Sequence, residues 1–166
     1  MTGQMQSRAV HLPTADRFTA SDTASKRMSK QLSIEVLEDW GAVVPLAVIW
    51  DELARQGESS SIFKTWEYAS TWWRIFGSDC KIRVLVARDE DGAVAGIAPF
   101  IITKGSTGPR RFLRQLTFIG CVHEPVSQFM DFLVRRDLRE EAGALFARYV
   151  FRDMSHEWDV VSVPLI

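Results

Sequence analysis

Three neighbouring residues, Cys121, His123 and Glu124, have the side-chain types of a nucleophile, a general base and a group that orients the base. In an extended chain, residues two positions apart point to the same face, so Cys121 and His123 share a face while Glu124 points the opposite way. This spacing does not build a triad, and we do not assign covalent catalysis to these residues.

Two carboxylates, Glu124 and Asp131, follow the last strand of an expected meander and are suited to hold a polar substrate. A carboxylate beside a substrate amine or hydroxyl can remove a proton from it. The simpler interpretation makes Glu124 a solvated loop acid, Asp131 a loop or helix-starting acid, and His123 a surface imidazole. We name Glu124 and Asp131 as candidate substrate-binding residues and leave the catalytic residues unassigned.

Aromatic side chains form a second candidate surface, because flat rings can stack on the apolar face of a sugar. Trp66 and Trp73 fall on the apolar stripe of an expected helix, which favours packing in the core. Trp72 lies one step off that stripe, so we expect it to be exposed or interfacial and name it as a third candidate substrate-binding residue. The remaining aromatic residues of this set are Trp158, Phe63 and Phe76.

Two short segments have the composition of anion sites. The glycine-rich segment 105–108 could form a nest of backbone N–H groups, but it lies between two expected strands, which favours a plain hairpin turn. A basic stretch surrounds it and could contact a phosphate or a partner, although a solvated sheet edge is favoured. The stretch consists of Lys104, Arg110, Arg111 and Arg114.

The cysteine and histidine positions do not predict a metal site. Cys80 and Cys121 lie far apart without a CxxC motif, which is typical of small core residues in a reducing compartment such as the cytoplasm. His11 and His156 have no ligand spacing either. We therefore expect neither a zinc site nor a disulfide.

Charge and hydropathy exclude other classes of partner. Twenty Lys and Arg residues against 21 Asp and Glu give a net charge of −1, so no overall field attracts nucleic acid or an anionic membrane. The longest apolar runs, 41–50 and 93–102, are too short for a spanning helix of ~20 residues. We expect a cytoplasmic protein without a transmembrane segment.

The length of 166 residues predicts one domain that buries a core without disulfides. Residues 1–31 are rich in Ser, Thr and basic residues and lack the apolar region of a secretory signal, so we expect a disordered leader. A transit peptide is the less favoured alternative for this segment. The folded domain is expected over residues 32–166.

Hydrophobic periodicity predicts the elements that position the candidate residues. One helix is expected from Pro45 to Gly57, and a second is expected to be capped by Thr65 and to end at Gly77. A third should begin at Asp137, where Glu140 completes a capping box. Strands are expected over 32–36, 81–88, 93–103, 112–119 and 158–163, with turns at 89–92 and 104–109.

This order of elements resembles the first part of the GNAT N-acyltransferase fold. Local landmarks resemble the N-terminal half of bacterial acetyltransferases of the CelD/BcsL type, which are associated with cellulose and exopolysaccharide biosynthesis. The resemblance covers residues 34–166. Its landmarks are the segments 50–53, 61–63 with Trp66, 72–77, 96–100, 116–120 and 131–133.

The resemblance implies an α/β (α+β) fold whose central, mostly antiparallel sheet is flanked by helices and is incomplete in this chain. It also implies acetyl-CoA or another acyl-CoA as cosubstrate, held mainly by a second GNAT-like half, and a saccharide precursor as acceptor. In the resembling proteins an acid near Asp131 precedes Phe-Leu, as it does here. Self-association through an exposed sheet edge is the other partner that we expect.

A GNAT site holds the CoA pyrophosphate on backbone N–H groups at the start of a helix. Its sequence mark is Gln/Arg-x-x-Gly-x-Gly/Ala, and the stretch from Gly120 to Asp137 does not contain it. Arg114-Gln115 precedes Gly120 at the wrong spacing. We therefore assign no cofactor-binding residue in this chain.

Three functions are compatible with these observations. The favoured hypothesis is one half of an acyltransferase that is completed by a second half. The alternative is a non-catalytic GNAT-like binding module or a truncated gene product without activity of its own. The least favoured hypothesis is a complete small acetyltransferase with a degenerate CoA loop.

Overall fold

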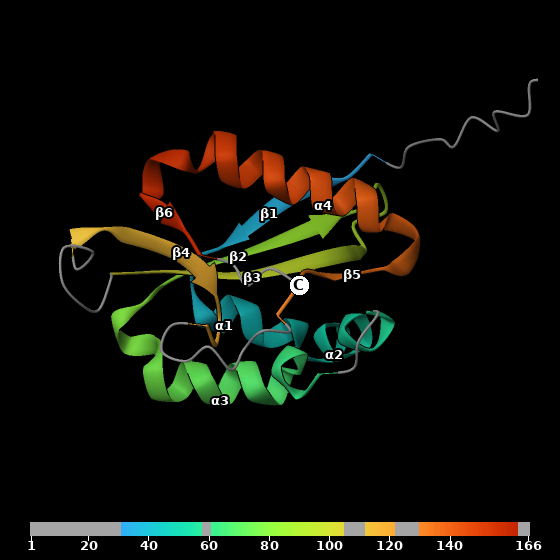
Figure 1. Ribbon diagram of the computed structural model, residues 1–166. Helices are drawn as coiled ribbons and strands as arrows, with labels where there is room; N and C mark the ends of the chain where they lie inside the picture. Colours follow the sequence, from blue (N-terminus) through green and yellow to red (C-terminus); the bar gives the residue numbers. More distant parts are fainter. Residues whose placement is uncertain (1–30, 58–60, 105–111, 122–129, 163–166) are drawn as a thin grey trace, which may run out of the picture.

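The computed structural model describes residues 31–57, 61–104, 112–121 and 130–162 and forms one sheet with helices on both faces (Figure 1). Five strands follow the order β1-β2-β3-β4-β6, and β5 also pairs with β3. The strands are β1 (Ser33–Leu37), β2 (Lys81–Arg88), β3 (Val94–Lys104), β4 (Arg114–Phe118), β5 (Leu133–Val134) and β6 (Val160–Val161). The helices are α1 (Trp40–Val43), α2 (Ala47–Gln56), α3 (Trp66–Phe76) and α4 (Arg139–Arg148).

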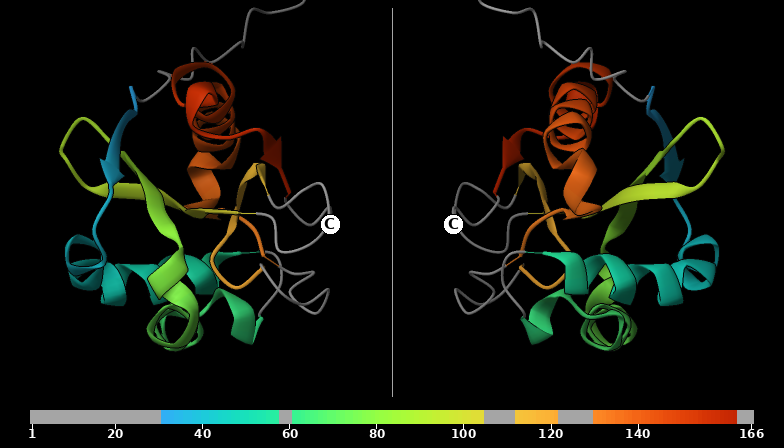
Figure 2. Two further views of the ribbon diagram at one scale, coloured as in Figure 1. Left: turned by 90° about the vertical axis from the view of Figure 1, so that its left-hand side faces the viewer. Right: turned by 90° about the vertical axis from the view of Figure 1, so that its right-hand side faces the viewer.

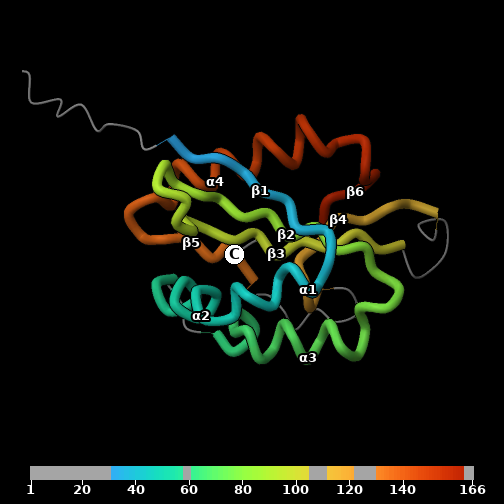
Figure 3. The backbone as a smooth tube through the Cα atoms, turned by 180° about the vertical axis from the view of Figure 1, so that it is seen from behind, coloured from blue at the N-terminus to red at the C-terminus, as the bar shows by residue number. Residues whose placement is uncertain are grey.

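The helices divide between the two faces of the sheet. Figure 2 shows α4 on one face and α1, α2 and α3 on the other. Seen from behind in Figure 3, the chain leaves β1 at the edge of the sheet and passes to α1 and α2 on the face opposite α4. The predicted class, a mostly antiparallel sheet flanked by helices, is confirmed.

Strands β2 to β4 form an antiparallel meander, as the sequence predicts, and β1 pairs antiparallel with β2 at the edge of the sheet. Alternation along the strands divides the core between the two faces of the sheet. Leu85 and Phe100 pack with Phe146 beneath α4, while Val84 and Ile101 pack with the opposite helices. Each strand of the central hairpin is therefore buried on both faces.

The turn between β2 and β3 forms at the predicted residues. Gly92 adopts a φ of 79°, in the region that favours glycine, and the Asp89 carboxylate accepts hydrogen bonds from the N–H groups of Asp91 and Ala93. These local bonds set the register of the hairpin.

Strands β4 and β5 occupy one continuous track along β3. Phe118 pairs with Phe100, and the N–H of Ile119 donates to Pro99, after which Leu133 pairs with Ile97. The chain thus leaves the edge of β3 near Gly120 and returns to the same edge at β5. In the sequence this return is marked only by a short apolar piece.

The last strand, β6, lies parallel to β4. Gln115 pairs with Val160 and Leu116 with Val161, and the connection between the two strands contains α4. The sequence predicts a closing strand over 158–163, but the strand covers two residues within the part of the chain that is described. A π-helix, Tyr149–Asp153, and a 3-10 turn, Ser155–Glu157, separate it from α4.

The predicted helix ends are right at α3 and wrong at α4. The Thr65 hydroxyl accepts a hydrogen bond from the N–H of Tyr68 and caps α3. The capping box at Asp137 does not form, because a 3-10 turn over Arg136–Leu138 precedes α4 and Asp137 lies inside it. The Asp137 carboxylate instead pairs with Arg135 at 2.8 Å.

Residues 1–30, 58–60, 105–111, 122–129 and 163–166 lie outside the described residues. The predicted leader over 1–31 falls almost wholly there, as do the glycine-rich turn, Arg110 and Arg111. Candidate Glu124 and its neighbour His123 also fall there. In the described part, none of the helices combines the length and the hydropathy needed to cross a bilayer.

Replacing Gly120 by alanine is expected to lower the free energy of unfolding by about 1–3 kcal/mol, measured by urea unfolding. Gly120 has a φ of 99°, and an added Cβ would lie 2.6 Å from Cε1 of Tyr68. The control is Gly143→Ala in α4, where a Cβ would meet nothing within 4 Å and alanine should stabilise the helix by about 0.5–1 kcal/mol. Equal stability of both variants would contradict this description of the turn.

Candidate functional site

Asp131 lies two residues before β5 and connects this segment to the start of α4. Its carboxylate accepts hydrogen bonds from the N–H of Phe132 at 2.7 Å and from Nη2 of Arg139 at 2.8 Å. One fifth of the Asp131 side chain remains exposed, compared with 42% of Arg139. Both carboxylate oxygens are therefore engaged by the protein, and substrate binding by Asp131 stays a prediction.

The expectation that Trp72 is exposed or interfacial is wrong. Only 7% of Trp72 is accessible, and its ring lies 5.6 Å from that of Phe76. The buried face of α3 contains Ala69 and Trp72, which are three positions apart, so Trp72 points toward the sheet. We withdraw Trp72 as a substrate-binding candidate.

Trp66 and Trp73 of α3 instead form a stack with Trp40 of α1. The centroid of the Trp40 ring lies 5.2 Å from each of the other two, with interplanar angles of 6° and 16°. Both faces of Trp40 are thus covered by other rings, and all three side chains are partly buried against the core. The structural interpretation of Trp66 and Trp73 is supported.

Helix α4 follows β4 and β5 in the chain. In a GNAT site, the start of the helix at this position would contact the pyrophosphate of CoA. The first six residues of α4 are Arg139-Glu140-Glu141-Ala142-Gly143-Ala144. Arg139 and Ala144 fit the Gln/Arg-x-x-Gly-x-Gly/Ala mark, but Ala142 stands where the mark requires glycine. From the sequence, the mark is expected between Gly120 and Asp137, because the helix is predicted to begin at Asp137. The helix begins at Arg139, so this segment lies outside that stretch.

The charges at this helix end do not fit a pyrophosphate. Glu140 and Glu141 occupy the first turn of α4, where unpaired backbone N–H groups would otherwise attract an anion. The guanidinium of Arg139 is already paired with Asp131. An acyl-CoA held here would place its diphosphate beside two carboxylates, so we assign none of its contacts to α4.

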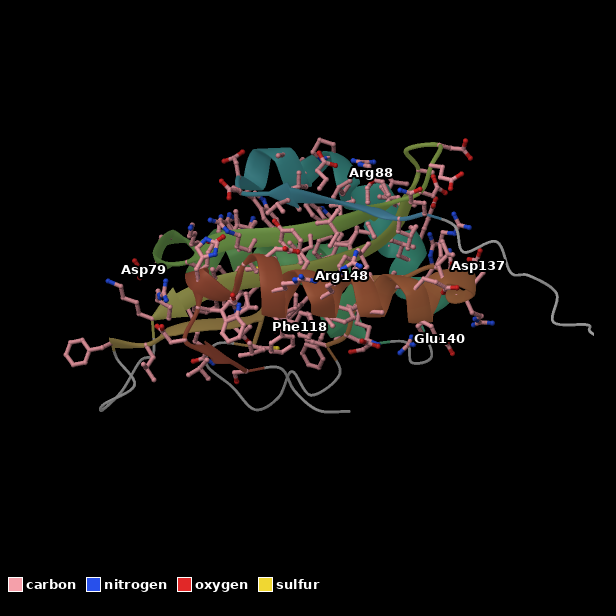
Figure 4. All side chains as sticks on the ribbon, turned by 90° about the horizontal axis from the view of Figure 1, so that it is seen from above. Asp79, Arg88, Phe118, Asp137, Glu140 and Arg148 are labelled. Carbon is pink, nitrogen blue, oxygen red and sulfur yellow. The ribbon has the colours of Figure 1, made fainter. Side chains whose placement is uncertain are left out.

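The opposite end of the sheet contains a cavity of about 590 Å³ on the side of α4. Figure 4 shows Asp79 at this end of the molecule and Asp137 and Glu140 at the other. Most residues of the cavity wall are charged. The charged residues are Asp79, Lys81, Arg83, Lys104, Arg114 and Glu157, and the wall is completed by Ile102, Thr103 and His156.

Arg83 and Glu157 form the buried part of this wall. Nε and Nη2 of Arg83 donate to Oε2 of Glu157 at 2.9 and 2.7 Å, and Lys81 donates to the same oxygen at 2.8 Å. Only 5% of the Arg83 side chain is exposed, and Glu38 completes its ion pairs at 3.1 Å. The pKa of Glu157 is lowered to about 2, mainly by hydrogen bonds from Arg83; burial opposes this shift, and a hydrogen bond from Lys81 adds to it.

Arg114 forms a second ion pair that holds the segment before β6. Its Nη2 donates to Asp159 at 2.9 Å, and its Nη1 donates to the carbonyl of His156 at 2.7 Å. Hydrogen bonds from the Arg114 side chain and backbone lower the pKa of Asp159 to about 2. Lys104 and Arg114 are both exposed, as predicted for a solvated edge, and Arg114 also binds the segment 155–159.

Acidification is expected to destabilise the fold between about pH 4.5 and pH 2. A carboxylate whose folded pKa is lowered contributes stability above its unfolded pKa, and this contribution is lost as the pH falls toward the folded value. Glu157 should therefore stabilise the protein fully above about pH 4.5 and no longer below about pH 2. Urea unfolding at several pH values measures this loss, which Glu157→Gln should reduce. An unchanged pH profile in Glu157→Gln would contradict the assignment.

The thiols and imidazole in the described residues do not combine with acids into a metal site. Across the described ranges, no three His, Cys, Asp or Glu side chains lie close enough together to hold an ion. Cys80 and Cys121 are both half-buried, and burial raises the pKa of the Cys80 thiol.

No model of a known protein family matches the chain, and neither does any curated protein. Solved structures resemble it weakly. Glucosamine-6-phosphate N-acetyltransferase from Arabidopsis thaliana is 13% identical, with a TM-score of 0.47 over 82% of this chain and 84% of that one. An integron cassette protein of V. cholerae is 15% identical, with a TM-score of 0.44 over 81% and 75%.

A GCN5-related N-acetyltransferase from Kribbella flavida is also similar. It is 18% identical, with a TM-score of 0.39 over 78% of this chain and 69% of that one. Two of these three structures are thus N-acetyltransferases by name. At these TM-scores and identities, the similarity supports no assignment of substrate or mechanism.

Proposed function

We propose that this chain is a GNAT-like domain of an acyltransferase that transfers an acyl group from acyl-CoA to an amine or hydroxyl. The observation that supports it is the topology. An antiparallel meander is followed by a helix and then by a strand parallel to β4, which is the order that the GNAT resemblance implies. This topology suits a scaffold on which an acyl acceptor and an acyl donor are brought together.

We further propose that acyl-CoA is held by a second GNAT-like half, as in proteins of the CelD/BcsL type. The first turn of α4 carries Glu140 and Glu141, which favours a donor site outside this chain. The acceptor would be a saccharide precursor in cellulose or exopolysaccharide biosynthesis, acylated in the cytoplasm. Asp131 and Glu124 remain the residues proposed to contact it.

A non-catalytic binding module is the second candidate function. It is favoured by the same two glutamates and by Ala142 in place of glycine. A domain that has lost its donor site needs neither the glycine nor a first helical turn without acidic residues. In that case the fold would serve recognition or self-association. The two candidates differ in whether the natural polypeptide processes acyl-CoA.

An acyl-transfer assay distinguishes them. The natural polypeptide that contains this sequence is purified from its source cell and incubated with acetyl-CoA and amine- or hydroxyl-bearing saccharides, and release of the CoA thiol is followed. The proposal predicts thiol release that depends on the saccharide, and none from the 166-residue chain alone. No release from the natural polypeptide would favour the non-catalytic module.

A further inference from the structure

The cavity beside Arg83 lies at the end of the sheet opposite the start of α4. Three basic residues stand at neighbouring strand ends: Lys81 begins β2, Lys104 ends β3, and Arg114 begins β4. Register brings them together, because Lys104 pairs with Arg114 and Lys81 pairs with Ile102. From Ile97, beside β5, to Lys104 the strand extends roughly 20 Å. The cavity is therefore separate from any donor site at the start of α4.

The charge of the cavity wall is positive. The wall contains four cationic side chains, Lys81, Arg83, Lys104 and Arg114, and two carboxylates, Asp79 and Glu157, which leaves a formal charge of +2. Asp159 and Glu38 pair with Arg114 and Arg83 without lining the cavity and bring the formal charge of the whole cluster to zero, so the positive charge is confined to the residues that line the cavity. A ligand with negative charge complements the wall.

Two groups on the wall have unused hydrogen-bonding capacity. Oε2 of Glu157 receives all three hydrogen bonds from Lys81 and Arg83, and Oε1 accepts none from the described residues. Nζ of Lys104 likewise donates to none of the described side chains or carbonyls. The cavity thus offers a cationic donor and an anionic acceptor to one ligand.

Two residues of the cavity wall, His156 and Glu157, follow an irregular extension of α4. The π-helix Tyr149–Asp153 closes with a hydrogen bond from the N–H of Met154 to the carbonyl of Tyr149 at 3.0 Å. The next turn carries His156 and Glu157 to the cavity, where Arg83, almost fully buried, holds Glu157. Short π-helical segments are frequent at functional sites, and this one positions two wall residues.

We propose that this cavity binds a small phosphomonoester that also carries a hydroxyl group. A phosphomonoester has a charge of about −1.5 to −2 at neutral pH, which is opposite in sign to the formal charge of the residues that line the cavity. Lys104 and Arg114 bind the phosphate oxygens, and Oε1 of Glu157 accepts a hydrogen bond from the hydroxyl. The cavity volume lies within the range of about 300–1,000 Å³ that small-molecule sites have.

The test is a titration of the full 166-residue chain with glycerol 3-phosphate, followed by amide chemical shifts in NMR. We expect saturable shifts at Lys81, Lys104 and Arg114, and tighter binding than that of methyl phosphate, a phosphomonoester that lacks the alcohol hydroxyl. Glycerol and acetate should give no saturable shift. Equal affinity for methyl phosphate would overturn the contact with Glu157.

Two variants locate the ligand. Lys104→Gln should weaken glycerol 3-phosphate binding about tenfold, because a charge-assisted hydrogen bond is lost. Arg148→Gln is the control, since it removes one exposed positive charge from the α4 surface outside the cavity wall. Equal weakening by both variants would indicate non-specific attraction to positive charge and overturn the proposal, as would the absence of saturable shifts up to about 20 mM.

Discussion

Replacing Phe146 by alanine is expected to lower the free energy of unfolding by about 3–5 kcal/mol, the largest effect that we expect of any single substitution in this chain. Phe146 lies on α4 and has no exposed surface. Its ring lies 5.1 Å from that of Phe132, and its Cε2 would be 3.4 Å from a Cβ at Gly96. Alanine would leave a cavity between α4 and the sheet where neither element can move closer without disturbing β3 and β5.

Phe151→Ala is the matched control for this substitution. Phe151 follows α4 in the π-helix, is 62% exposed and contacts Trp158 edge-to-face. Its removal should cost about 1 kcal/mol, mainly from the aromatic contact. Urea unfolding of both variants measures the difference, and equal losses would contradict the packing of α4 against the sheet.

Replacing Glu157 by alanine is expected to lower the free energy of unfolding by about 3 kcal/mol, because Arg83 would remain buried with only one ion-pair partner. Arg83 is 5% exposed, and its remaining partner Glu38 is 64% exposed. Lys81 would also lose its partner, but it is 57% exposed and can be solvated by water. The main cost therefore arises from the guanidinium of Arg83.

A double variant, Arg83→Met with Glu157→Ala, separates the buried charge from the packing. Replacing a buried ion pair by apolar groups is often close to neutral, so the double variant should regain most of the stability that Glu157→Ala loses. The measurement is again urea unfolding of the three proteins. A double variant no more stable than Glu157→Ala would show that the loss arises from packing, not from an unpaired charge.

Helix α3 and the meander could be predicted from the sequence because their signals are local. Thr65 caps α3, Gly92 permits the tight turn, and the β-branched run over 81–88 becomes β2 with the predicted bounds. Each signal depends on residues within a few positions of one another. Local signals of this kind give element bounds without knowledge of the tertiary fold.

The features that the sequence did not predict depend on long-range pairing. Strand β5 consists of two residues, and only its register with β3 shows that it continues the track of β4. Periodicity places Trp72 off the apolar stripe, but α3 is rotated so that Trp66 and Trp73 meet Trp40 and Trp72 meets the sheet. Neither result follows from periodicity within one element.

In the candidate site, too, local features could be predicted from the sequence and long-range contacts could not. Asp131 could be singled out from its place before Phe-Leu, but its partner Arg139 could not, because that contact depends on the 3-10 turn before α4. The cavity at the far end of the sheet has no local signal in the sequence. Its residues are separated by up to 78 positions, from Asp79 to Glu157, and only Lys104 and Arg114 belong to the basic stretch that the sequence indicates.

The most direct test of the proposed function is a calorimetric titration with acetyl-CoA of the 166-residue chain and of the natural polypeptide that contains it. The account predicts that the natural polypeptide binds acetyl-CoA with a dissociation constant in the micromolar range, and that the 166-residue chain binds at least ~100-fold more weakly, because α4 begins with two glutamates. Failure of the natural polypeptide to bind, or equally tight binding by the isolated chain, would contradict it.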